Sequence, residues 1–114
     1  MAIATAALKN ILATAYAGAA THAALYTTAP GATAGAEVTG GSPAYARKAL
    51  TWSAASNGAI TATVTFDVPA GTTVVGAGVH SAATGGTYYD GGTVTSQQFA
   101  TQGTYTLTLS YTQS

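Results

Sequence analysis

Charged side chains are scarce in this chain of 114 residues, which has three Lys or Arg, three Asp or Glu and a net charge of zero. A soluble domain usually carries about a quarter charged residues, and net charge helps to keep free proteins apart. The chain is therefore poorly equipped to remain a free monomer. Its composition indicates a subunit of a larger assembly, with much of its surface covered by neighbours.

Cysteine is absent, which excludes disulfides, cysteine-ligated metals and a thiol nucleophile. No apolar run approaches the about 18 residues of a membrane span, because Thr5 and Lys9 interrupt the Ala-rich start. The only basic pair is Arg47-Lys48, too little to attract a phosphate backbone. Neither a membrane nor a nucleic acid is expected as a partner.

The Ala-rich start could also mimic a signal peptide, since Ala15-Tyr16-Ala17 has the form of a cleavage site. No basic region precedes Lys9, however. We therefore expect synthesis and assembly in the cytoplasm of the producing cell.

Large apolar side chains are few as well, because 27 of the 54 residues counted as hydrophobic are Ala. Thr is frequent, at 22 residues, and its branched side chain favours strands. The chain is long enough for one domain, 1–114, with a thin core. A partner surface would help to stabilise such a core.

The patterns along the chain predict a mainly β fold, a small antiparallel sandwich or barrel with a short N-terminal helix and an extended loop. The helix is expected at 4–17, where Leu8, Ile11, Leu12 and Ala15 have helical spacing and Gly18 is a stop signal. The loop or arm covers 29–43, and antiparallel strands fill 44–112. Strands are expected at 22–28, 44–54, 60–68, 72–80, 87–89, 93–95 and 104–112.

Turn signals separate these strands. Asn57-Gly58 predicts a tight hairpin between 44–54 and 60–68, which would place Trp52 in the core beside Phe66. Asp90-Gly91-Gly92 predicts a second turn. The arm 29–43 has too few large apolar residues to pack by itself, so we expect another subunit to order it.

The sequence offers few candidate catalytic residues. The three carboxylates, Glu37, Asp67 and Asp90, are scattered, and neither His22 nor His80 lies in a recognisable motif. Metal binding needs three or four converging ligands, which this set does not suggest. We expect no catalytic residues, cofactor or metal, and no enzyme activity.

The candidate sites are therefore contacts with a partner: Pro30, Glu37, Tyr88 and Tyr89. Tyr88-Tyr89 is the best candidate for an exposed aromatic contact. Arg47 and Lys48 point to opposite faces of a strand, and one of them is expected to pair with Glu37 or Asp67. Trp52 and the tyrosines could alternatively form a platform for a sugar ring.

Several short motifs resemble, in order and spacing, a family of small virion proteins of tailed phages. They are Leu25–Pro30, Glu37–Gly41, Tyr45–Arg47, Thr51–Ser56 and Gly78–Gly86, and the resemblance covers about residues 25–95. Members are usually labelled tail fibre or minor tail proteins, and some similar small β-domains are capsid decoration proteins. The resemblance implies a structural component of a virion that associates with other virion proteins and with copies of itself.

Within that family we expect a capsid decoration (cement) protein that stabilises the head by contacts with the major capsid protein. The chain has no heptads or collagen-like repeat of the kind a fibre shaft needs. The alternative is a tail fibre or minor tail protein involved in attachment to the host surface. A glycan-binding module outside a virion is a third hypothesis.

Overall fold

The computed structural model describes residues 5–113, which form one helix and six strands. In chain order these are α1 (Ala6–Ala19), β1 (His22–Tyr26), β2 (Lys48–Ala49), β3 (Ala59–Val68), β4 (Thr72–His80), β5 (Tyr88–Phe99) and β6 (Gly103–Thr112). All strand pairs are antiparallel. The expected mainly β fold with a short N-terminal helix is confirmed.

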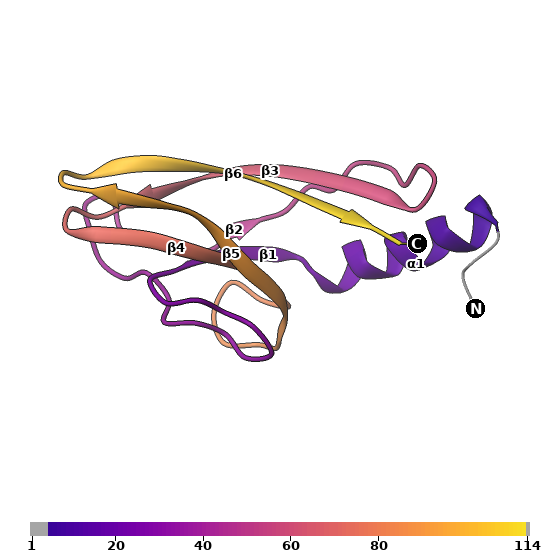
Figure 1. The fold of residues 1–114 in the computed structure, drawn as a ribbon, viewed down its shortest axis with the longest axis horizontal. Helices are drawn as coiled ribbons and strands as arrows, with labels where there is room; N and C mark the ends of the chain where they lie inside the picture. Colours follow the sequence, from indigo (N-terminus) through magenta and orange to yellow (C-terminus); the bar gives the residue numbers. More distant parts are fainter. Residues whose placement is uncertain (1–4, 114) are drawn as a thin grey trace.

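The strands form two sheets that share one core (Figure 1). One sheet has four strands in the order β2-β1-β4-β5, and the other is a two-stranded ribbon of β3 and β6. Leu25 and Val74 from the larger sheet meet Phe66, Val68 and Leu107 from the ribbon. Burial of these large side chains between the sheets stabilises the fold through the hydrophobic effect.

The β3–β6 ribbon follows its sequence pattern closely. Ile60, Ala62, Phe66 and Val68 are buried, whereas Thr61, Thr63 and Thr65 between them are exposed. Successive side chains of a strand point to opposite faces, so this alternation fixes which face covers the core. The predicted strands 60–68 and 104–112 are confirmed.

Helix α1 begins after Thr5, whose hydroxyl accepts a hydrogen bond from the Leu8 backbone N–H. It passes through Gly18 and ends at Ala19, so the expected stop at Gly18 is wrong. Position 4 of the predicted helix lies outside the described residues. Only Ala13 of the helix is fully buried, so its packed side differs from the apolar stripe that the sequence indicated.

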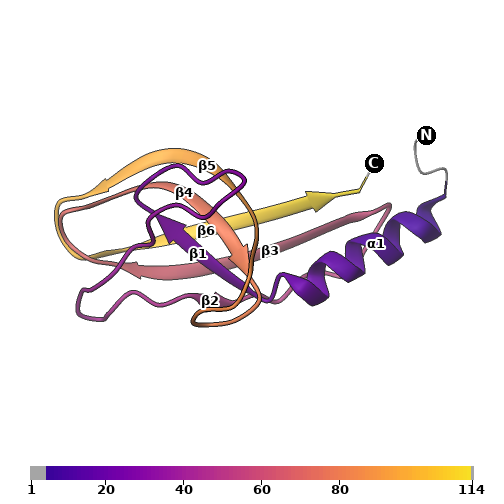
Figure 2. The ribbon, with the colours of Figure 1, turned by 90° about the horizontal axis from the view of Figure 1, so that it is seen from below.

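The segment 44–54 is not the long strand that the sequence predicted, because within it only Lys48–Ala49 joins a sheet, by pairing with β1. Its hydrogen bonds go to several partners: the Leu50 N–H donates to the Thr21 carbonyl oxygen and the Ser53 N–H to that of Thr61. The chain crosses here from the larger sheet to the ribbon (Figure 2). A segment that changes sheets cannot keep one pairing partner. Asn57 and Gly58 do form a tight turn with positive φ, but β3 pairs with β6.

The predicted turn at Asp90-Gly91-Gly92 is also wrong, because β5 runs through it. Gly91 lies opposite Gly78 of β4, and a Cβ built on Gly91 would lie 2.5 Å from the Tyr88 hydroxyl. Glycine is needed here for close approach within a strand and not for a turn.

The arm 29–43 contains no helix or strand, but it packs on its own subunit. Val38 is fully buried in the core, and its N–H donates to the Leu25 carbonyl oxygen at 3.1 Å. Thr27 N–H donates to the Ala36 carbonyl oxygen at 2.7 Å. The chain itself therefore holds this part of the arm, and ordering of the exposed remainder by another subunit stays a prediction.

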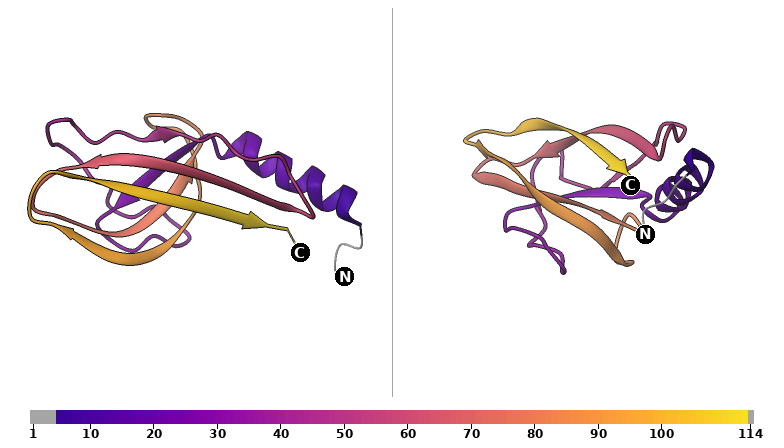
Figure 3. Two further views of the ribbon diagram at one scale, coloured as in Figure 1. Left: turned by 90° about the horizontal axis from the view of Figure 1, so that it is seen from above. Right: turned by 45° about the vertical axis from the view of Figure 1, so that its right-hand side comes forward.

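The molecule is elongated, 48 × 24 × 23 Å. One end is the two-sheet sandwich, and at the other end the β3–β6 ribbon and α1 extend side by side (Figure 3). The Asn10 side-chain oxygen accepts from the Gly58 N–H at 2.8 Å, which fastens the helix to the tip of the ribbon.

Candidate functional site

Three of the four predicted contact residues are engaged within the chain. Pro30 lies against Gly76, where a Cβ would come within 2.4 Å of its ring. Tyr88 donates a hydrogen bond to the Gly31 carbonyl oxygen at 2.8 Å. Glu37 pairs with Arg47. Only Tyr89, 51 % exposed, presents most of its side chain to solvent.

Glu37 and Arg47 form an ion pair, which is one of the pairings that the sequence suggested for the basic residues. Arg47 Nη2 lies 2.9 Å from Glu37 Oε1, and the Tyr45 hydroxyl donates to Glu37 Oε2 at 2.8 Å. Arg47 Nη1 also donates to the carbonyl oxygens of Ala82 and Gly85, at 3.1 and 2.8 Å. The pair thus ties the arm to the loop between β4 and β5.

The electrostatics of this pair match its geometry. Burial raises the pKa of the Glu37 carboxyl, but hydrogen bonds from Arg47 and Tyr45 outweigh burial and hold it below the ordinary value. The hydrogen bond to Glu37 raises the pKa of Arg47. A shallow cavity of about 350 Å³ lies beside the pair, lined also by Thr39, Gly40, Ala83 and Thr84. Since both charges are neutralised internally, the cavity presents little net charge to a ligand.

The sequence analysis missed a cluster in which the buried Tyr26 and His80 meet the half-buried Tyr88. The Tyr26 hydroxyl hydrogen-bonds to His80 Nε2, and the Tyr88 ring lies edge-on to His80 with centroids 5.5 Å apart. Burial and the charge of Arg47 lower the pKa of His80, and burial raises that of Tyr26 to about 12. His80 is 4 % exposed, and the hydroxyl of Tyr26 occupies its Nε2. Only the β-strand positions of Tyr26 and His80 could have indicated this pairing.

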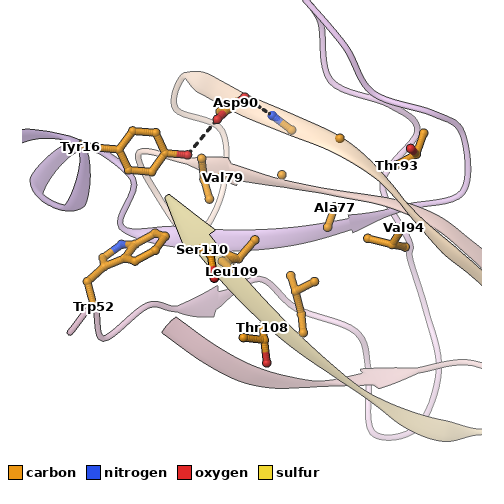
Figure 4. A pocket seen from close by; sticks show the side chains of 14 residues that line it. Tyr16, Trp52, Ala77, Val79, Asp90, Thr93, Val94, Thr108, Leu109 and Ser110 are labelled. Atoms are coloured by element: carbon orange, nitrogen blue, oxygen red, sulfur yellow. Dashed lines mark hydrogen bonds between the residues drawn. The ribbon is translucent and has the colours of Figure 1, made fainter. Parts of the chain in front are cut away.

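A cleft between β5 and β6 is the second cavity, with a volume of about 190 Å³ (Figure 4). At one end the Tyr16 hydroxyl donates to Asp90 Oδ2 at 2.9 Å. Burial and this hydrogen bond raise the pKa of Tyr16. The Tyr16 ring stacks on Tyr111, with centroids 4.0 Å apart, so one face of the ring is covered.

Trp52 lines the same cleft and does not pack beside Phe66 as predicted. Its ring meets the Tyr16 ring edge-on at 5.8 Å, and its Nε1 donates to the Ala20 carbonyl oxygen at 2.8 Å. Phe66 stacks on Tyr45 instead. The reason is that 44–54 crosses between the sheets and does not form a hairpin with β3. The sugar-platform alternative stays untested.

The apolar stripe of α1 is exposed to solvent, which the sequence analysis did not predict. Leu8, Ile11 and Leu12 are 46, 64 and 37 % exposed. The side of the helix that faces the ribbon carries Asn10, Ala13 and Tyr16. The sequence indicated the apolar stripe but not whether it faces the core or the solvent.

Across residues 5–113, no three His, Cys, Asp or Glu side chains converge in a way that could hold a metal ion. In the same part of the chain, no helix is long and apolar enough to cross a membrane. The expectation that the protein is not an enzyme stays a prediction.

The described residues form an elongated β domain with few charged side chains. Comparison with protein families identifies the class: the chain belongs to a family of phage tail fibre-type virion proteins. The family is described as Podophage GP4 fiber I protein gp80, and its model matches residues 2–112. The chain is therefore a virion protein that associates with other virion proteins. No curated protein and no solved structure matches it.

Proposed function

We propose that this protein is a non-enzymatic structural subunit of a phage tail fibre. The observation that carries the proposal is the match of nearly the whole chain, residues 2–112, to a family described as a podophage fibre protein. The sequence analysis favoured capsid decoration, but the family description supports the tail alternative more directly. Capsid decoration is the competing hypothesis that the experiment must separate.

A scaffold role is supported by the polar side chains, which form hydrogen bonds and ion pairs within the chain. The Glu37–Arg47 ion pair and the Tyr26–His80 hydrogen bond both hold parts of the same chain together. No buried side-chain nitrogen or oxygen among the described residues lacks a hydrogen-bond partner. Buried polar groups that are satisfied within the chain stabilise one fold, as a scaffold role requires.

Labelling of intact virions with an antibody against this protein, viewed by electron microscopy, tests the proposal. Label confined to the tail or its fibres supports it. Label spread over the head would refute the fibre role and favour capsid decoration. Virions that lack the protein serve as the control for antibody specificity.

A further inference from the structure

The β3–β6 ribbon leaves one long strand edge open. On one side β6 pairs with β3 over ten consecutive residues, from Gly103 opposite Val68 to Thr112 opposite Ala59. Within residues 5–113, no strand pairs with the other side of β6. An edge of this length presents a row of backbone donors and acceptors.

The register shows which backbone groups face this open edge. The Gln113 N–H donates to the Gly58 carbonyl oxygen at 2.9 Å, and these two residues continue the β3–β6 register. In an antiparallel pair, hydrogen-bonded and non-hydrogen-bonded positions alternate. The N–H groups of Leu107 and Leu109 therefore point toward β3, and those of Thr106, Thr108 and Ser110 point away from it.

Two further contacts agree with this assignment. The hydroxyls of the facing pairs Thr63–Thr108 and Thr65–Thr106 are 3.2 and 3.1 Å apart, and side chains lie closer in non-hydrogen-bonded pairs. On β3, the Thr61 carbonyl oxygen faces away from β6 and accepts from the Ser53 N–H at 2.8 Å. Thr61 lies opposite Ser110, which is thus also a non-hydrogen-bonded position.

The open edge of β6 lacks the features that usually prevent pairing. Soluble proteins protect long edges with charged side chains, proline or bulges. Gly103–Thr112 contains no charged residue and no proline, and its register is unbroken. The outer strand of the larger sheet differs, since β5 carries Asp90 and its pairing with β4 has two register shifts. The outer side of β3 is partly covered by Ser53 and α1.

We propose that β6 pairs antiparallel with β6 of a second copy of this chain. Two ribbons would then form one four-stranded sheet in the order β3-β6-β6-β3. A second copy fits because it presents the same uncharged edge, so pairing around a two-fold axis brings no like charges together. The C-terminal end of β6 extends beyond the sandwich (Figures 1 and 3), whereas residues 107–110 border the cleft toward β5. This inference is independent of whether the protein lies on the tail or the head.

The test is the oligomeric state of Thr108→Pro, measured by size-exclusion chromatography with light scattering. Proline removes an N–H that the β3–β6 ladder does not use, and edge strands tolerate it at such positions. Thr108→Ala is the matched control, since it also loses the hydroxyl contact with Thr63 but keeps the N–H. We expect a dimer for the wild type and Thr108→Ala, and a monomer for Thr108→Pro. A monomeric wild type, or a folded Thr108→Pro that still dimerises, would overturn the proposal.

Hydrogen exchange of the wild type gives a second readout if Thr108→Pro fails to fold. On assembly, the Thr106, Thr108 and Ser110 amides should exchange at least tenfold more slowly than in diluted protein. The Leu107 and Leu109 amides, which already bond to β3, should change little. Equal protection of both sets at all concentrations contradicts pairing through this edge.

Discussion

At the scale of single residues, the fold depends on a few polar side chains that are paired inside one subunit. The Glu37–Arg47 pair joins the arm to the loop after β4. The Tyr26–His80 pair joins β1 to β4, and Gly78 of β4 leaves room for the Tyr26 ring. Both arrangements predict specific effects of substitution.

Glu37→Gln should lower the free energy of unfolding by about 1–3 kcal/mol at pH 7, since it removes the charged partner of a half-buried Arg47. The folded protein holds the pKa of Glu37 below its ordinary value of 4.5. The unfolded state therefore binds the proton first, and the contribution of Glu37 is present above pH 4.5 and is lost as pH falls below it. Urea unfolding of both proteins from pH 7 to pH 3 measures this. A stability difference that does not shrink in acid would contradict the assignment.

Gly78→Ala should destabilise the protein by about 1–3 kcal/mol through overpacking. A Cβ at Gly78 would lie 2.8 Å from the Tyr26 ring and 2.8 Å from the Asp90 carbonyl oxygen. Gly92→Ala, on the neighbouring strand, is the control, because a Cβ there meets nothing within 4 Å. Thermal melts compare the two. Equal melting temperatures for both variants would show that the Tyr26 ring is not packed on Gly78.

At the scale of elements, the sequence predicted best where one pairing partner persists. The strict alternation of Ile60–Val68 determined both a strand and its buried face, and the structure agrees. It failed for 44–54, because hydrogen bonds to Thr21 and Thr61 divide this segment between two sheets. The sequence prediction also failed at Gly91. The Asp-Gly-Gly motif there indicated a turn, but the glycine allows close packing against Tyr88 within β5. Local patterns do not contain such long-range contacts.

The candidate contacts show the same limit. Pairing of Arg47 with Glu37 was predictable because charges are few. The inward position of Tyr88 was not, since its partners His80 and Gly31 come from other elements. The direction of the α1 stripe also depends on tertiary packing, because both sides of the helix carry apolar residues.

Substitutions on α1 test that direction. Ile11→Gln should change the free energy of unfolding by less than about 0.5 kcal/mol, because Ile11 is 64 % exposed. Ala13→Gln should cost about 1–3 kcal/mol, since it forces a longer polar side chain into a fully buried site. Both variants introduce Gln, and the helix propensity that only Ala13→Gln loses is less than about 0.7 kcal/mol, so burial accounts for most of the expected difference. Urea titration gives both values, and a larger loss for Ile11→Gln would place the stripe against the protein.

At the scale of the whole molecule, the scarcity of charged side chains is the property that agrees best with a role as a virion subunit. Six charged side chains, two of them paired with each other, leave little for electrostatic attachment. Attachment should depend on apolar burial, shape and strand pairing. A wash of virions in about 1 M salt, where the Debye length is about 3 Å, should therefore leave the protein bound. Its release into the supernatant, measured by gel densitometry, would instead indicate attachment through charges.

The most direct test of the fibre assignment is quantitative mass spectrometry of heads and tails separated from purified virions. A tail fibre has few symmetric positions on the particle, whereas a decoration protein covers the capsid lattice. We predict that this protein is recovered with the tails, at a copy number far below that of the major capsid protein. Recovery with the heads, at a copy number comparable with the major capsid protein, would contradict the fibre assignment.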